Sequence, residues 1–114
     1  MGVPFGQLIT QNDVTTAVAI RAASSTLVAI RAFESGIAGD AYIQLFNTAA
    51  AANVTLGTTV PDWVVMLDQA VGDVSSGDGL PTHGLVYSAG IVIASTTTPT
   101  GSTTRESNVR VVVG

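Results

Sequence analysis

The sequence predicts an all-β fold, a β-sandwich or jelly-roll-like domain of about six to eight short strands. Charged residues make up only 11% of the chain, against about 25% in an average globular domain. Its polar character comes instead from Thr, Ser and Asn, and β-branched Thr suits exposed strand faces. Short runs of Val, Ile and Thr follow one another between turns rich in Gly, Pro and Thr. No helical segments alternate with these runs, which argues against a parallel sheet.

The chain has 114 residues, a length that suits a single hydrophobic core. We expect one β-sandwich domain over residues 13–114, preceded by residues 1–12 as an N-terminal arm or as a first strand. In an arm, Pro4 would stiffen the backbone, and apolar side chains would contact a neighbouring subunit or a capsid. The residues proposed for this contact are Val3, Pro4, Phe5, Leu8 and Ile9. The two alternatives stay open.

Two segments near the start of the domain, Val14–Ile20 and Thr26–Phe33, are rich in Val, Ile and Thr and predict two strands with a short connection. A helix is the rival interpretation because alanines are frequent, but the density of β-branched residues favours strands. Alternation divides the second segment into two faces, with Leu27, Ala29, Arg31 and Phe33 on one and Val28, Ile30 and Ala32 on the other.

The middle of the chain predicts two further strands. Residues 41–47 alternate, with Tyr42, Gln44 and Phe46 opposite Ile43 and Leu45. Residues 48–61 read as a connecting loop with room for at most one helical turn. Residues 62–69 contain the single tryptophan, Trp63, in an apolar alternating run, which is typical of a core strand.

The last third of the chain predicts a long turn-rich loop and up to three strands. Residues 71–81 are the stretch richest in turn-forming residues. Residues 84–95 predict one or two strands around Gly90, where a glycine indicates a bulge or close packing. A polar connection then leads to a final strand over residues 108–113.

Charge and composition exclude several classes of function. The chain has four arginines, no lysine and a net charge of −4, and so lacks the basic patch from which nucleic-acid binders gain most of their affinity. Without cysteine there is no disulfide and no thiolate metal site. Residues 41–61 are uncharged but too polar to span a bilayer, so we expect neither a nucleic acid nor a membrane as partner. The first residues lack the regions of a secretory signal, which favours synthesis in the cytoplasm.

No catalytic or metal-binding motif is convincing. His83 is the single histidine, and although Ser88 and Asp78 are near in sequence, the surroundings of Ser88 do not match a nucleophile elbow. The segment 72–79 offers the oxygen atoms of Asp73, Ser75 and Asp78 to calcium, but turns in which Asp and Ser bond their own backbone explain the same residues. We therefore expect no enzyme activity, no cofactor and no metal.

Two groups of segments carry a resemblance to a known family. They are Tyr42–Asn47 with Thr55–Pro61 and Trp63, and Gly84–Leu85 with Ala89–Ile91 and Ala94–Thr98. Together they resemble small virion proteins of tailed bacteriophages that decorate or cement the capsid. The resemblance implies a β-sandwich or jelly roll that sits on the outside of the shell formed by the major capsid protein, as a homotrimer, and stiffens it. Its strand and turn pattern also fits tail and baseplate components.

A carbohydrate-binding module is the remaining alternative. Trp63, Tyr42 and Phe46 would supply its aromatic platform. Aromatic residues in alternating apolar runs are more often part of a core.

Overall fold

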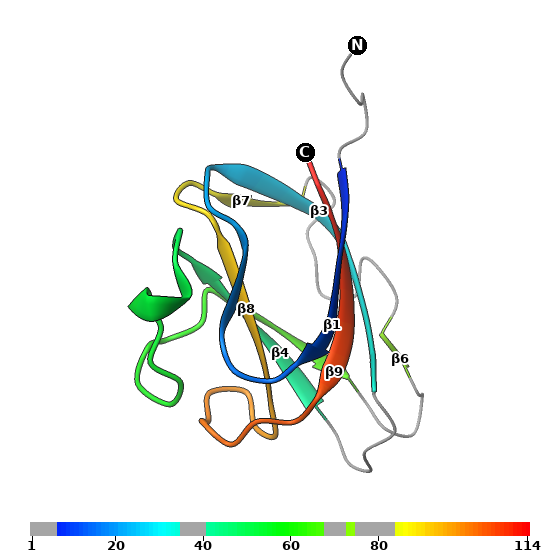
Figure 1. Cartoon of the computed structure of the whole chain (residues 1–114), viewed down its shortest axis with the longest axis vertical. Coiled ribbons are helices and arrows are strands. Elements are labelled where there is room, and N and C mark those ends of the chain that lie inside the picture. Colours follow the sequence, from blue (N-terminus) through cyan, green and yellow to red (C-terminus); the bar gives the residue numbers. More distant parts are fainter. Residues whose placement is uncertain (1–6, 35–40, 68–72, 75–83) are drawn as a thin grey trace.

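The computed structural model describes residues 7–34, 41–67, 73–74 and 84–114, and these form two antiparallel β-sheets that face each other (Figure 1). The predicted all-β sandwich is confirmed. Sheet A contains β1 (Gln7–Val14), β9 (Ser107–Val113), β3 (Ser25–Glu34), β6 (Asp73–Val74) and β7 (Leu85–Tyr87), and sheet B contains β2 (Val18–Arg21), β8 (Ile91–Thr96), β4 (Ala41–Asn47) and β5 (Trp63–Leu67). One 3-10 turn, η1 (Ala51–Asn53), is the helical element of the described residues, and none of their helical segments is long and apolar enough to cross a membrane.

The strand order is that of a jelly roll. Sheet A runs β1-β9-β3-β6 with β7 also on β3, and sheet B runs β2-β8-β4-β5. β6 pairs with one end of β3, at Ala32 and Phe33, and β7 with the other end, from Ser25 to Leu27. The nine described strands therefore fill eight positions, in which β1 lies beside β9 and β2 beside β8. Except for β4–β5 and β6–β7, which stay within one sheet, consecutive strands pass from one sheet to the other, as in jelly rolls built from two Greek keys.

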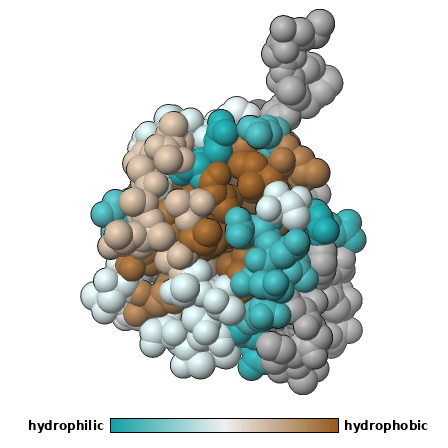
Figure 2. Space-filling view, viewed as in Figure 1, coloured by the Kyte–Doolittle hydropathy of each residue, from teal (hydrophilic) through white to brown (hydrophobic). Residues whose placement is uncertain are grey.

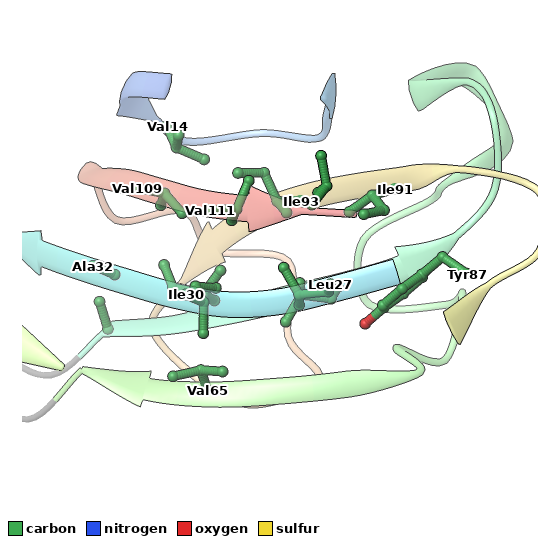
Figure 3. Packing of buried hydrophobic residues seen from close by; sticks show 14 residues of the cluster. Val14, Leu27, Ile30, Ala32, Val65, Tyr87, Ile91, Ile93, Val109 and Val111 are labelled. Atoms are coloured by element: carbon green, nitrogen blue, oxygen red, sulfur yellow. The ribbon is translucent and has the colours of Figure 1, made fainter. Parts of the chain in front are cut away.

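The main core lies between the two sheets. Its side chains come from the inward faces of both sheets and point toward one another (Figure 3). The fully enclosed members are aliphatic, with one tyrosine at the edge: Val14, Leu27, Ile30, Ala32, Ala41, Ile43, Leu45, Val65, Tyr87, Ile91, Ile93, Val109, Val111 and Val113. Burial of such side chains contributes about 1.5–3 kcal/mol each, so this layer holds the fold together.

A second apolar layer covers the outer face of sheet B. Phe46, Val92 and Ala94 are buried there against Val54 and Leu56 of the segment that joins β4 to β5. Because this segment covers one side and the main core the other, β8 is buried along its whole length. The alternation predicted for residues 41–47 is correct, but both of its faces are interior.

The N-terminal strands differ from the prediction. Residues 14–20 do not form one strand, because Val14 ends β1 in sheet A and β2 begins at Val18 in sheet B. Residues 15–17 carry the chain across, and the Thr15 carbonyl accepts a hydrogen bond from the Ser95 amide of β8 at 2.9 Å. Of the two alternatives for the N-terminal region, residues 7–12 form a first strand paired with β9, and residues 1–6 lie outside the described part.

A bulge corrects the predicted faces of β3. Leu27 pairs with Val113, but Ala29 pairs with Val112, so Val28 is an extra residue in the ladder. Since an extra residue shifts the alternation by one, Ala29 and Arg31 lie opposite Val112 and Arg110 on the outer face instead of sharing a face with Leu27. The inward side chains are Leu27, Ile30 and Ala32.

The other expectations agree with the structure or lie outside its described residues. β4 has the predicted bounds, and Gly90 separates β7 from β8. A Cβ atom on Gly90 would lie 2.5 Å from the Arg21 carbonyl oxygen and 2.8 Å from that of Thr48, which confirms the predicted close packing. The loop predicted over residues 71–81 contains β6, and its other residues are not described.

Candidate interaction surface

The outer face of sheet A carries exposed apolar side chains. Leu8 on β1 is 62% exposed, Val28 on β3 is 47% exposed and Val86 on β7 is 74% exposed. On sheet B the segment after β4 covers Phe46, Val92 and Ala94, while Met66 on β5 is 44% exposed and Val60 of the covering segment is 80% exposed. Figure 2 shows hydrophobic side chains reaching the surface near the N-terminal end of β1 and hydrophilic ones further along the strand. Solvent-exposed apolar side chains gathered on one face of a domain are typical of a contact surface.

Strand register places this face in cross-strand rows. Leu8 lies opposite Val112, which lies opposite Ala29. In the next row Thr10 lies opposite Arg110, which lies opposite Arg31. The two rows form a hollow of about 200 Å³, lined by Leu8, Ala29, Ile30, Arg31, Arg110 and Val112. We call these six residues the sheet-A hollow.

The sheet-A hollow is mainly apolar, and two arginines contribute to its lining. Arg31 and Arg110 face each other directly on β3 and β9, and they are two of the four cations in a chain that contains eight acidic residues. The hollow therefore offers aliphatic surface from Leu8, Ala29 and Val112 beside the side chains of these two arginines.

The residues predicted as subunit or capsid contacts are distributed as follows. Leu8 lies on the outer face of sheet A and lines the hollow. Its neighbour Ile9 points to the opposite side of β1 and packs against the main core. Val3, Pro4 and Phe5 lie outside the described residues. The sequence suggested Leu8 as a contact residue but not the two arginines that lie beside it in the hollow, because their juxtaposition depends on which strands pair.

The candidate chemical groups do not come together in the described part of the chain. Ser88 is exposed, and its Oγ accepts a hydrogen bond from Asn47 Nδ2 at 3.2 Å. Asn47 also accepts one from the Ala89 amide at 2.9 Å and donates its own amide to Asp62 at 2.6 Å, so this cluster ties the end of β4 to the turn after β7. Among the described residues no three His, Asp or Glu side chains could hold a metal ion. His83, Ser75 and Asp78 lie outside them.

The aromatic residues of the carbohydrate-binding hypothesis lie on opposite faces of sheet B. Trp63 packs against the main core between the sheets. Phe46 is buried in the second apolar layer on the other face. Since a sugar platform needs its rings side by side at the surface, these two residues cannot form one with Tyr42.

Buried polar groups connect loops and sheets. Gln44 is fully buried, and its Nε2 donates hydrogen bonds to Thr96 Oγ1 at 2.8 Å and to the carbonyl oxygens of Thr98 and Gly101 at 3.3 and 3.2 Å. Gln44 thereby fixes the connection between β8 and β9.

Burial, with a smaller contribution from the charge of Asp62, raises the pKa of the Tyr87 phenol well above its ordinary value.

The fold defines the class of the molecule, an antiparallel jelly-roll sandwich with exposed apolar side chains on the outer face of sheet A. No protein family, curated protein or solved structure matched the chain when it was compared with all three.

Proposed function

We propose that the chain is a structural virion protein that binds the outside of a bacteriophage capsid through protein contacts. The observation that carries this proposal is a partial difference between the two outer faces. On sheet B the segment after β4 covers Phe46, Val92 and Ala94, although Met66 stays 44% exposed, whereas on sheet A Leu8, Val28 and Val86 are exposed by 62%, 47% and 74%. A monomer gains nothing from exposing them, whereas burial at an interface would stabilise a complex by about 25 cal/mol for each Å² of apolar surface.

Composition and topology support the same function. A chain with 11% charged residues and no lysine has a surface like that of protein interfaces, from which Lys and Glu are depleted. Jelly rolls recur in viral capsid proteins, although they also occur in lectins and enzymes, so topology alone does not decide. The net charge of −4 keeps the protein from competing for packaged DNA, which favours the capsid exterior over the interior.

In this function the partner is the major capsid protein, and the chain assembles as a homotrimer that stiffens the shell. A trimer would give each decorating unit three copies of the sheet-A face, and linked contacts of this kind bind far more tightly than one. A tail or baseplate component would use the same face against a different neighbour.

The experiment compares binding to capsid shells that lack the protein with binding to isolated tails. We expect the wild-type chain to sediment with the shells and to scatter light as a trimer. Leu8→Asp introduces a charge on the contact face and should weaken shell binding about tenfold or more. Val60→Asp is the matched control, because Val60 is 80% exposed and lies on the segment that covers sheet B. Sedimentation with tails alone, or equal binding by the two variants, would contradict the proposal.

A further inference from the structure

We propose that two copies of the chain join edge to edge, with β1 of one copy pairing antiparallel to β1 of the other about a two-fold axis at Ile9. Sheet A of one copy then continues into sheet A of the other. The inference goes beyond the proposed function, because the contact lies at the edge of sheet A and not on its outer face. It joins two single copies, or one copy from each of two trimers.

β1 is an open edge of sheet A. It lies at the end of the strand order beside β9 (Figure 1), which is its one partner among the described strands. Every second residue of an antiparallel edge strand points its backbone N–H and C=O groups away from its neighbour. These groups form a row of alternating donors and acceptors, and another extended strand matches such a row. The chemistry of this edge therefore selects a strand as its occupant.

β1 lacks the devices by which proteins protect an edge. The usual ones are lysine, proline, inward-pointing charges, bulges and very short strands. Residues 7–12 contain neither a charged residue nor proline, and the ladder to β9 is regular from Gln7 to Gln11, with its bulge further on. The other edge strands of the described residues are shorter, with four residues in β2, five in β5, two in β6 and three in β7, against eight in β1. β1 is therefore the edge with the most room for a second strand.

Symmetry restricts the register of the pair. A two-fold axis perpendicular to the sheet keeps the outer faces of both copies on one side, so residues that lie opposite each other must belong to the same face. An axis at Ile9 satisfies this condition and uses the whole regular segment. It places Gln7 opposite Gln11 and Leu8 opposite Thr10. All of these side chains are uncharged, so no like charges oppose the pairing along this segment.

Charges at the two ends of the edge make a second copy the best occupant. At one end Arg21 of β2 lies against β1, and its Nη1 donates a hydrogen bond to Gln7 Oε1 at 3.2 Å. At the other end Asp13 is exposed. In the pair, Gln7 lies opposite Gln11 of the second copy, and Asp13 of that copy stands two residues further on. Diagonal neighbours of this kind are about 7–8 Å apart and within reach of long side chains, so the arginine of each copy meets the aspartate of the other.

The first experiment traps the pair by a disulfide. The chain has no cysteine, so each introduced cysteine reports one position. Leu8→Cys and Thr10→Cys chains, one of them carrying a mass tag, are mixed in equal amounts and oxidised. We expect the linked heterodimer in an excess of about fivefold or more over either homodimer, because only the heterodimer holds its cysteines directly opposite each other.

The homodimers are disfavoured by distance. Two copies of one variant hold their cysteines on the diagonal, and cysteines whose Cα atoms are more than about 7 Å apart are not bridged. The control mixture is Thr58→Cys with Val60→Cys, which changes exposed residues on the segment that covers sheet B. It should give heterodimers and homodimers in statistical proportion.

The second experiment measures self-association by sedimentation velocity over a range of concentrations. We expect the mass of the wild-type particle to rise with concentration. Thr10→Glu places a carboxylate at the seam and should weaken the association about tenfold or more. Thr10 is exposed, so the fold tolerates this change. Thr58→Glu is the matched control, with the same change at an exposed position away from the edge, and it should associate like the wild type.

Asp13→Asn tests the charged contact. Asparagine tolerates the φ of 55° at this position, and the substitution removes one acid from each copy. We expect the association to weaken about two- to fivefold, although each copy is then less negative and long-range repulsion falls. Unchanged or stronger association would overturn the contact between Arg21 and Asp13, and with it the register centred on Ile9.

The outcomes keep the β1 pair apart from the proposed function. A wild type whose mass stays constant at all concentrations, a statistical mixture of disulfides at the edge, or a Thr10→Cys homodimer in excess would overturn the pair as proposed. Pairing without binding to capsid shells would leave the pair standing and contradict the function. Shell binding by a wild type that never pairs would do the reverse.

Discussion

A pair of buried serines offers the most direct test of how the two sheets are joined. Ser95 on β8 and Ser107 on β9 are both fully buried, and their Oγ atoms lie 2.8 Å apart. The pair is a hydrogen bond from sheet B to sheet A. The backbone of Ser95 is already engaged, since its amide donates to the Thr15 carbonyl and its carbonyl accepts from the Arg105 amide. If one serine is replaced, the hydroxyl of the other therefore has few other groups with which it could form a hydrogen bond.

The expected magnitudes follow from the cost of an unpaired buried hydroxyl. Ser95→Ala should destabilise the chain by about 1–3 kcal/mol, because the Ser107 hydroxyl stays buried without its partner. Ser107→Ala should cost a similar amount for the reciprocal reason. The double variant replaces both polar groups by methyl groups, which is close to neutral in a buried setting. It should therefore be more stable than the sum of the single effects predicts, by about 1–2 kcal/mol.

The assay is urea unfolding of the wild type and the three variants at constant pH, followed by tryptophan fluorescence and circular dichroism. Ser24→Ala is the control, because Ser24 is exposed in the turn between β2 and β3 and should change stability by less than about 0.5 kcal/mol. Additive losses in the double variant would refute the reasoning, since they would mean that each hydroxyl contributes independently of the other.

Two further predictions concern packing and pH. Gly90→Ala should cost about 2–4 kcal/mol, because the new Cβ would meet the backbone of Arg21, Thr48 and Ala49 at 2.5–2.9 Å. Gly57→Ala, at a φ of 85° but with only the Ser102 side chain nearby at 3.2 Å, should cost about 1 kcal/mol; equal losses in urea unfolding would contradict this. The raised pKa of Tyr87 means that the unfolded chain releases the phenol proton first as pH rises above about 10, so the wild type should lose up to about 1.4 kcal/mol per pH unit there. Tyr87→Phe should remove this part of the loss, and unfolding curves at pH 8, 10 and 11 with unchanged pH dependence in the variant would disprove it.

The fold was largely predictable because most strands carry their own signal. Residues 41–47 alternate without interruption, and β4 has those bounds. β1 was harder to predict from the sequence. Gln7, Gln11 and Asn12 are polar, and the apolar residues Leu8 and Ile9 are adjacent, so the strand has no regular apolar alternation. Such polarity suits an edge strand, which β1 is. The crossing at residues 15–17 contains neither Gly nor Pro, so no turn signal separated β1 from β2.

The candidate site was much less predictable than the fold. Leu8 could be named from its own apolar character near the start of the chain. Arg31 and Arg110 are separated by most of the sequence, and only the pairing of β3 with β9 makes them neighbours. The bulge at Val28 also reverses the faces on which Ala29 and Arg31 lie. Bulges depend on the partner strand as much as on the local residues, so the sequence of β3 alone cannot reveal one.

The position of β9 in sheet A sets a condition on when the contact face can exist. β9 is the last of the described strands in chain order, and it lies between β1 and β3, so the rows Leu8–Val112–Ala29 and Thr10–Arg110–Arg31 have no middle member until β9 docks. Closing such distant strand pairs is slow, typically milliseconds to seconds in sandwich folds. A chain in which β9 has not docked therefore lacks the outer face of sheet A. If the proposed function is correct, binding to a capsid would depend on the finished fold, and incompletely folded copies would be left out of the particle.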